Sequence, residues 1–93
     1  MSEKRTIWKF PIPVDNEIKD VQMPVGAKIL CLQMQRATPC LWAQVNPFNG
    51  REVRTFEWKG TGINESPQDN RNYIGTVQTH DGDYVFHLFE ILP

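Results

Sequence analysis

The sequence predicts an all-β protein, either a small antiparallel β-sandwich or a partly open barrel of about seven short strands. Turn-forming residues recur about every ten residues along the chain. The segments between them are rich in Ile, Val, Thr, Trp, Phe and Tyr, which suit a pleated, half-buried surface. No stretch repeats apolar residues with the i, i+3, i+4 spacing of an amphipathic helix. A chain of 93 residues makes one domain, spanning 1–93, with a modest core that self-association would enlarge.

Turn signals divide the chain into its expected strands. The turns are Pro11 to Asn16, Pro24 to Gly26, Ala37 to Pro39, Asn46 to Gly50, Gly60 to Asn72, and Asp81-Gly82. The strands expected between them span residues 5–10, 17–22, 27–35, 40–46, 52–58, 73–79 and 84–89. The stretch KILCLQMQ, residues 28–35, is apolar on both faces at its start, which is typical of a central strand.

A hairpin is expected in the middle of the chain, because Asn49-Gly50 is a common two-residue turn. Such a turn would place one apolar set on a common face: Leu41, Ala43, Val45, Phe56 and Trp58. Pro47 would then lie in a strand next to the turn, where it disfavours regular pairing and allows a longer loop.

The most strongly predicted element is the last hairpin, because Asp81-Gly82 favours a two-residue type I′ turn. This turn fixes a register in which Thr79 faces Tyr84, Val77 faces Phe86, and Thr76 faces His87. One face then carries Gly75, Val77, Phe86 and Leu88, and the other carries Ile74, Thr76, Gln78, Val85, His87 and Phe89. Both faces hold large apolar groups, so we expect a second sheet to cover one face and a second subunit or a ligand to cover the other.

Charge and composition exclude several classes of protein. A net charge of −1 argues against binding of duplex nucleic acid, which needs a basic surplus, but allows a local site for one small anion. No run approaches the length of a membrane span, and the N-terminal residues lack the apolar core of a signal peptide. We therefore expect a cytoplasmic location, with Cys31 and Cys40 reduced. The two cysteines flank a turn, which allows a cross-strand contact, but two buried thiols are the favoured arrangement. Two cysteines without clustered histidines make a poor metal site.

An enzyme is not expected, because no catalytic pattern of nucleophile, base and orienting partner is present. His80 lies beside a turn, and the carboxylates Asp81 and Asp83 are common turn residues. We expect no catalytic residues, no metal and no cofactor.

Binding residues are suggested by two patterns. Gly60-Thr61-Gly62 opens a long polar loop, and glycine-rich backbone can approach an anion closely, although a lone G-x-G is more often a simple turn. Aromatic rings alternate with cations at Trp8-Lys9, around Arg54, and at Arg71 to Tyr73, as in sites that stack bases and pair with phosphate. Most of these rings are better explained as core residues, with Lys and Arg on the solvent faces between them. His87, with Thr76 opposite, is either a satisfied core histidine or a polar member of a site.

The chain resembles a family of short β-rich proteins of unassigned function from tailed phages and bacterial genomes. The matching segments are Thr6-Ile7-Trp8-Lys9-Phe10, Met23-Pro24, Gly26-Ala27, Ile29-Leu30, Leu41-Trp42-Ala43 with Val45, Arg54 with Phe56, Gly60-Thr61-Gly62, Tyr73-Ile74-Gly75-Thr76 with Gln78, and Phe86-His87-Leu88-Phe89-Glu90. They follow one another over nearly the whole chain. The resemblance implies a phage protein of the kind that sequesters cyclic nucleotide signals of antiphage defence in the host cytoplasm.

Our leading hypothesis is therefore a non-catalytic homodimer or larger homo-oligomer that binds a cyclic di- or trinucleotide. The expected ligand-binding residues are Trp8 or Tyr73 for base stacking, Lys9, Arg54 or Arg71 for phosphate, the backbone of Gly60, Thr61 and Gly62, and Thr76 and His87 for hydrogen bonds. The alternative is a phage accessory or structural protein whose apolar sheet face docks on a protein partner. Binding of single-stranded nucleic acid is a third hypothesis, which the near-neutral charge disfavours.

Overall fold

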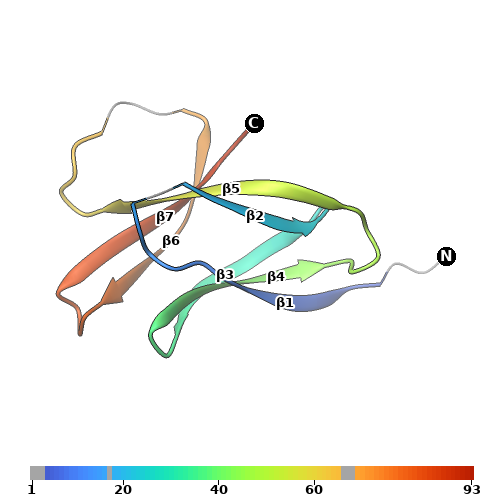
Figure 1. Cartoon of the computed structure of the whole chain (residues 1–93), viewed down its shortest axis with the longest axis horizontal. Coiled ribbons are helices and arrows are strands. Elements are labelled where there is room, and N and C mark those ends of the chain that lie inside the picture. Colours follow the sequence, from blue (N-terminus) through green and yellow to red (C-terminus); the bar gives the residue numbers. More distant parts are fainter. Residues whose placement is uncertain (1–3, 17, 66–68) are drawn as a thin grey trace.

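The computed structural model describes residues 4–16, 18–65 and 69–93, and within them seven antiparallel strands form two sheets (Figure 1). The strands are β1 (Thr6–Pro11), β2 (Lys19–Pro24), β3 (Lys28–Gln35), β4 (Thr38–Val45), β5 (Arg51–Gly60), β6 (Arg71–Thr79) and β7 (Tyr84–Ile91). One sheet has the order β1-β4-β3 and the other β2-β5-β7-β6. The sandwich expected from the sequence is confirmed, and the strands described here do not close into a barrel.

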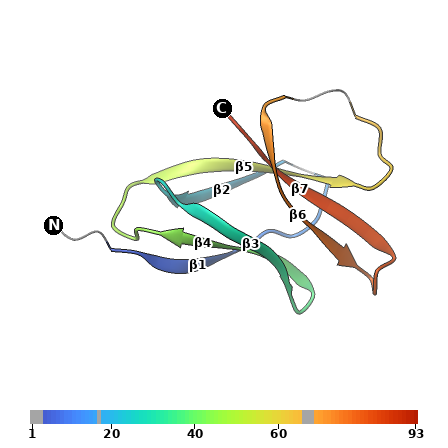
Figure 2. The same cartoon turned by 180° about the vertical axis from the view of Figure 1, so that it is seen from behind.

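The two sheets pack face to face around an apolar core (Figures 1 and 2). Leu41 and Ala43 of β4 and Phe56 of β5 have no measurable exposure, and Leu88 of β7 lies with them. In Figure 1, β2 and β5 lie on one side of the molecule and β1 and β4 on the other, so the two layers are separated within the plane of this view. None of the described residues belongs to a helix with the length and apolarity that crossing a membrane requires.

The register predicted for the β6–β7 hairpin is confirmed. Val77 pairs with Phe86 and Thr76 pairs with His87. At its tip His80, Asp81 and Gly82 all have positive φ, at 54°, 57° and 93°. The turn is therefore left-handed over three successive residues, one more than a two-residue type I′ turn requires.

The predicted position of Ile74 on the same face as Thr76 and His87 is wrong. The register shifts between Tyr73 and Gly75, and Ile74 packs against the core. A Cβ at Gly75 would lie 3.2 Å from Leu32 side-chain atoms of the facing sheet, so glycine allows a close approach of β6 to β3. The bulge places the extra residue on the side where apolar contacts are available.

The predicted hairpin around Asn49-Gly50 is also wrong. β4 pairs with β1 on one side and with β3 on the other, so no edge of β4 remains for β5. The chain instead turns after Val45, where the Asn49 backbone N–H donates to the Asn46 carbonyl, and crosses to the second sheet. The apolar residues assigned to one hairpin face do share one core, but they approach it from opposite sheets.

An ion pair lies between the two sheets at the edge of the core. Arg54 of β5 donates from Nε and Nη2 to the two carboxylate oxygens of Glu90 on β7, at 2.7 and 2.9 Å. Its Nη1 donates to the backbone carbonyl of Ala27, which precedes the other sheet. The hydrogen bonds to Glu90 raise the pKa of Arg54 above its usual value, despite the opposing effect of burial. Arg54 thus connects the two sheets.

Replacing Arg54 with Ala is expected to lower the free energy of unfolding by about 2–3 kcal/mol, because it leaves Glu90 mostly buried and unpaired. In a domain of this size that corresponds to a fall in Tm of roughly 10–20 °C. The double variant Arg54→Met, Glu90→Leu should recover most of the loss, since both charges are then removed. Chemical denaturation of the three proteins checks this, and a loss below about 0.5 kcal/mol in Arg54→Ala would contradict it.

Candidate functional site

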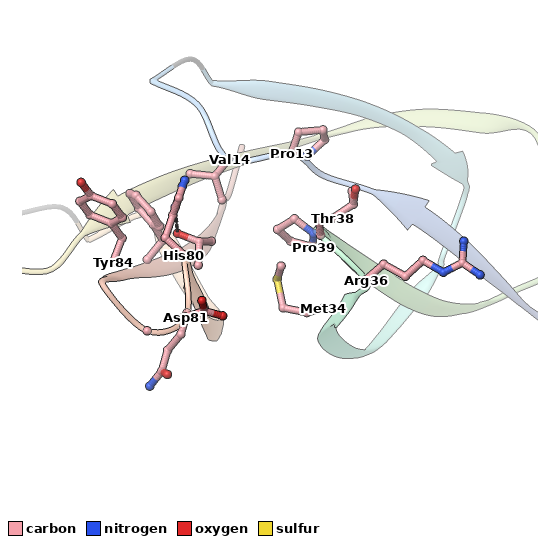
Figure 3. Close-up of a pocket in the computed structure, with 14 residues that line it drawn as sticks. Pro13, Val14, Met34, Arg36, Thr38, Pro39, His80, Asp81 and Tyr84 are labelled. Carbon is pink, nitrogen blue, oxygen red and sulfur yellow. Dashed lines mark hydrogen bonds between the residues drawn. The ribbon is translucent and has the colours of Figure 1, made fainter.

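A cleft of about 950 Å³ opens between the tips of the β3–β4 and β6–β7 hairpins, at one end of the sandwich (Figure 3). We call it the hairpin cleft. It is lined by Pro13, Val14, Met34, Arg36, Ala37, Thr38, Pro39, Gln78, Thr79, His80, Asp81, Gly82, Tyr84 and Phe86. Its volume lies within the range of ligand sites, about 300–1,000 Å³.

The cleft forms because the two sheets diverge beyond the core. Aligned sheets cross at an angle of about 30°, so hairpins that extend past the crossing separate from each other. Leu88 faces the opposite sheet and is fully buried, whereas Tyr84, on the same side of β7 but at the hairpin tip, is 55% exposed. The inward-facing side chains therefore continue from the core into an open cleft.

Aromatic rings form one wall of the hairpin cleft. The rings of Tyr84 and Phe86 lie 6.4 Å apart and are tilted by only 30°, and His80 meets Tyr84 edge-on at 5.2 Å. Met34 and Pro39 of the β3–β4 hairpin lie across the opening (Figure 3). A flat aromatic ligand between these walls would contact a ring on one side and apolar atoms on the other.

The rims of the cleft carry opposite charges. Asp81 lies at the tip of the β6–β7 hairpin, and its carboxylate points into the opening (Figure 3). Arg36 lies at the tip of the β3–β4 hairpin, with its side chain extended away from Met34 (Figure 3). Within the described part of the chain, neither side chain has a hydrogen-bond or ion-pair partner. Neither charge is neutralised by a described residue, but only the Asp81 carboxylate points into the opening, and the Arg36 guanidinium points away from it (Figure 3).

The second candidate region is the outer face of the four-stranded sheet, which we call the Tyr73 face. Alternation along β6 and β7 brings several residues predicted from the sequence together here: Thr61, Arg71, Tyr73, Thr76 and His87. His87 joins them through both ring nitrogens, with Nε2 2.7 Å from Thr61 Oγ1 and Nδ1 2.9 Å from Thr76 Oγ1. The Tyr73 hydroxyl in turn meets Thr76 Oγ1. The result is one continuous row of hydrogen bonds that joins β6 and β7 to the turn after β5.

The cations of the Tyr73 face are already paired. Arg71 forms a bidentate ion pair with Glu65, and its Cζ lies 3.9 Å from the centre of the Phe89 ring. Lys59 Nζ lies 2.6 Å from a Glu57 carboxylate oxygen and 3.7 Å from Glu65. The hydrogen bond from Arg71 is the main reason that the pKa of Glu65 is lowered. The phosphate contact expected at Arg71 stays a prediction, and a phosphate there would have to displace Glu65.

Three other predicted binding residues, Trp8, Lys9 and Arg54, belong neither to the hairpin cleft nor to the Tyr73 face, and they do not form a site with one another. Trp8 lies on the core-facing side of β1, with Arg51 Cζ 5.5 Å from its ring centre. Lys9 points the other way and donates to Gln35 Oε1 at 2.6 Å. Arg54 is held by Glu90 between the sheets. Their roles in binding remain predictions, and each cation would first have to leave its present partner.

Gly60, Thr61 and Gly62 form the turn that leaves β5. The Thr61 N–H donates to the Val85 carbonyl at 3.1 Å, and the Ile63 N–H donates to the Gly60 carbonyl at 3.4 Å. Gly62 has φ of 84°, which glycine adopts without strain. These two N–H groups are therefore used within the protein and are not directed at an anion. The rest of the loop includes residues 66–68, which lie outside the described part of the chain.

The sequence does not predict the hairpin cleft. Its lining comes from segments that the sequence predicts as turns, at 11–16, 37–39 and 81–82, or from strand residues next to them. One signal was present, because aromatic side chains at Tyr84 and Phe86 continue the core-facing side of β7 right up to a turn. That pattern indicates that the apolar side of β7 extends along the strand beyond the length that the core covers.

One sequence comparison gives a match. The family described as Domain of unknown function (DUF7352) matches residues 3–92, nearly the whole chain, and the chain belongs to this family. No curated protein and no solved structure matches it.

Glu65 provides a pH test of the Tyr73 face. Because Arg71 lowers the folded-state pKa of Glu65, the pair stabilises the fold above the unfolded-state pKa, and this contribution is lost as pH falls through the folded value. Glu65→Gln should therefore be less stable than wild type at pH 6, with the difference shrinking toward pH 3. Urea denaturation at both pH values measures this. Asp83→Asn is the control, and an equal Glu65→Gln effect at both pH values would contradict the assignment.

Proposed function

We propose that this member of a family without an assigned activity is a non-catalytic protein that binds and sequesters a cyclic di- or trinucleotide in the hairpin cleft. The observation that carries the proposal is the cleft itself, with flat rings on one wall and an unpaired arginine on the opposite rim. In the phage setting that the sequence resemblance implies, such binding would lower the free concentration of a defence signal.

The size and walls of the cleft support a ligand with more than one base. A volume of about 950 Å³ is larger than one nucleotide needs and is suited to a compact ring of two or three nucleotides. Stacking of a base on a protein ring is worth about 1–3 kcal/mol and does not depend strongly on the base. Tyr84 and Phe86 offer neighbouring ring faces for this purpose.

The charges of the cleft also support a nucleotide. Arg36 has a long side chain with no competing carboxylate among the described residues, so a rotamer change would bring its guanidinium to a phosphate at the open side. On the Tyr73 face, by contrast, Arg71 and Lys59 are already neutralised by Glu65 and Glu57. We therefore favour the cleft over the Tyr73 face as the binding site.

The residues that line the hairpin cleft favour ligand binding over catalysis. His80 Nδ1 is 3.2 Å from the hydroxyl of Thr79 in its own turn. The other titratable groups of the lining are Arg36, Asp81 and Tyr84, which suit recognition better than attack on a phosphodiester. Sequestration needs only tight binding and slow release of an intact ligand.

A protein-docking function is the second candidate. Tyr73 is 59% exposed and Val53 is 56% exposed, and both lie on the outer face of the four-stranded sheet. Exposed aromatic and aliphatic groups on one face are typical of protein interfaces. The homo-oligomer expected from the sequence would use this face, and sedimentation velocity of the purified protein checks whether it forms.

The proposal predicts that one cyclic di- or trinucleotide from a panel raises Tm, because a ligand that binds only the folded state stabilises it. The compound should be recovered intact after denaturation, since a hydrolysed compound would indicate an enzyme. No shift with any member of the panel at millimolar concentration would contradict the proposal.

Variants then locate the ligand. Tyr84→Ala should weaken binding about 5–150-fold, because it removes a stacking surface. Arg36→Asn should also weaken it, and Asn tolerates the positive φ of 56° at this turn position. Isothermal titration of these proteins is compared with Arg71→Gln and Lys9→Ala as controls outside the cleft. Unchanged affinity in both cleft variants, with a loss in Arg71→Gln, would assign the ligand to the Tyr73 face.

A further inference from the structure

The outer face of the three-stranded sheet belongs to neither candidate region. Leu41, Ala43 and Val45 of β4 pack in the core, so the alternate residues Trp42 and Gln44 point outward. The strands on either side, β1 and β3, place exposed side chains in register with them: Ile7, Lys9, Lys28, Cys31 and Gln33. We call this surface the Trp42 face. Figure 1 shows β1 and β4 on the side of the molecule away from β2 and β5.

Trp42 lies at the centre of the Trp42 face, because β4 is the middle strand of the sheet. Lys9 of β1 is its partner on one side, and Cys31 of β3 is its partner on the other. The other two tryptophans are used in the core, since Trp58 is 7% exposed and Trp8 packs against the core cluster. Trp42 is partly exposed and does not belong to that cluster. An outward aromatic ring on an open sheet is the arrangement on which unpaired bases stack.

The charges of the chain are divided unevenly between the two sheets. Residues 4–11 and 27–46, which include all of β1, β3 and β4, hold none of the eleven Asp and Glu residues. They hold five of the ten Lys and Arg residues: Lys4, Arg5, Lys9, Lys28 and Arg36. The net charge of −1 is therefore the sum of a basic sheet and an acidic remainder. A basic face without carboxylates is complementary to a chain of phosphates, whatever the net charge of the whole protein.

The two lysines of the Trp42 face keep their charges. In the described residues no carboxylate pairs with Lys28. Lys9 donates to the neutral amide of Gln35, so an exchange of this partner for a phosphate gains a contact between opposite charges. Beside Lys28 the surface has a hollow of about 260 Å³, lined also by Arg5 and Gln44, whose N–H groups are donors suited to phosphate oxygens.

We propose that the Trp42 face binds single-stranded nucleic acid, as a second site separate from the hairpin cleft. One base stacks on Trp42, and the phosphates on its two sides meet Lys9 and Lys28. These lysines lie on β1 and β3, two strands apart and two residues out of step, so strand spacing places their Cα atoms about 12 Å apart on a diagonal across β4. An open face suits an extended chain, whereas the bases of a duplex are not free to stack on a protein ring.

The test measures fluorescence anisotropy of labelled oligothymidylate and oligouridylate, each of about 12 nucleotides, with the full chain. Trp42→Leu keeps an apolar side chain but removes the ring, and it should weaken binding about 5–150-fold. Lys28→Gln should reduce the slope of log affinity against log salt by about 0.7, because one phosphate contact is lost. Lys19→Gln on β2 is the matched control and should change neither quantity. Binding of either oligonucleotide supports the proposal, and the tighter one identifies DNA or RNA.

Trp42→Phe tests the stacking contact without removing an aromatic ring. The oligonucleotide should quench part of the tryptophan fluorescence of the wild type, because a base stacked on an indole quenches its emission. Trp42→Phe should retain most of the affinity and lose this quenching. A tryptophan that served only to pack the sheet would not change its emission when the oligonucleotide binds, and unchanged emission in the wild type would overturn the proposal.

Three further results would overturn the proposal: no binding of either oligonucleotide at low ionic strength, equally tight binding of polyglutamate or of a duplex of the same length, and unchanged affinity in folded Trp42→Leu. None of them bears on cyclic nucleotide binding in the hairpin cleft, which is measured separately. A cyclic nucleotide that occupies the cleft should not displace the oligonucleotide. Displacement would assign both ligands to one surface and would contradict a second site.

Discussion

The burial of one face of each sheet against the other is the constraint on which the rest of the structure depends. Leu41 on one sheet and Phe56 and Leu88 on the other are completely buried, and these contacts fix how the sheets cross. The Arg54–Glu90 pair, bound also to the Ala27 carbonyl, closes the core at its edge. Because a sheet pair can be fully packed only near its crossing, the hairpins that extend beyond it are free to diverge.

Both candidate regions follow from this packing, but they differ in how their charges are satisfied. On the Tyr73 face every described cation has a carboxylate close by, and the His87 ring is hydrogen-bonded at both nitrogens. In the hairpin cleft the two charged groups have no partner in the described residues, and they stand on separate hairpins. A group that is unsatisfied within the protein retains its full capacity to bind a ligand. The cleft therefore carries the functional proposal, although the sequence pattern drew attention to the other face.

The strand positions were predictable because they depend on local chemistry. Turn residues and β-branched or aromatic runs place all seven strands within a few residues of their observed bounds, and Asp81-Gly82 alone fixes the register of the last hairpin. The pairing of β4 with β5 was not predictable from Asn49-Gly50, because the choice of sheet depends on partners distant in sequence. The bulge at Ile74 likewise depends on a close approach between Gly75 and Leu32 that no local pattern encodes.

For the two candidate sites, too, one part was predictable from local sequence pattern and the other part depends on tertiary packing. Strand alternation and hairpin register predicted that Thr76 and His87 lie together on one face, and they do. The hairpin cleft was not predictable, because it depends on where the opposite sheet ends. Along one side of β7 the environment changes from the closed core at Leu88 to the open cleft at Tyr84, although both positions read as apolar. Such a change is a property of two hairpins in space and not of either hairpin alone.

The most direct test of the central claim is a ¹H–¹⁵N correlation NMR titration of the labelled protein with the cyclic nucleotide that it binds most tightly. If the ligand occupies the cleft, the largest shift changes will fall on residues 34–39 and 78–86, on both hairpins at once. Changes confined to residues 71–76 and 87–91, on the Tyr73 face, would contradict the assignment of the site.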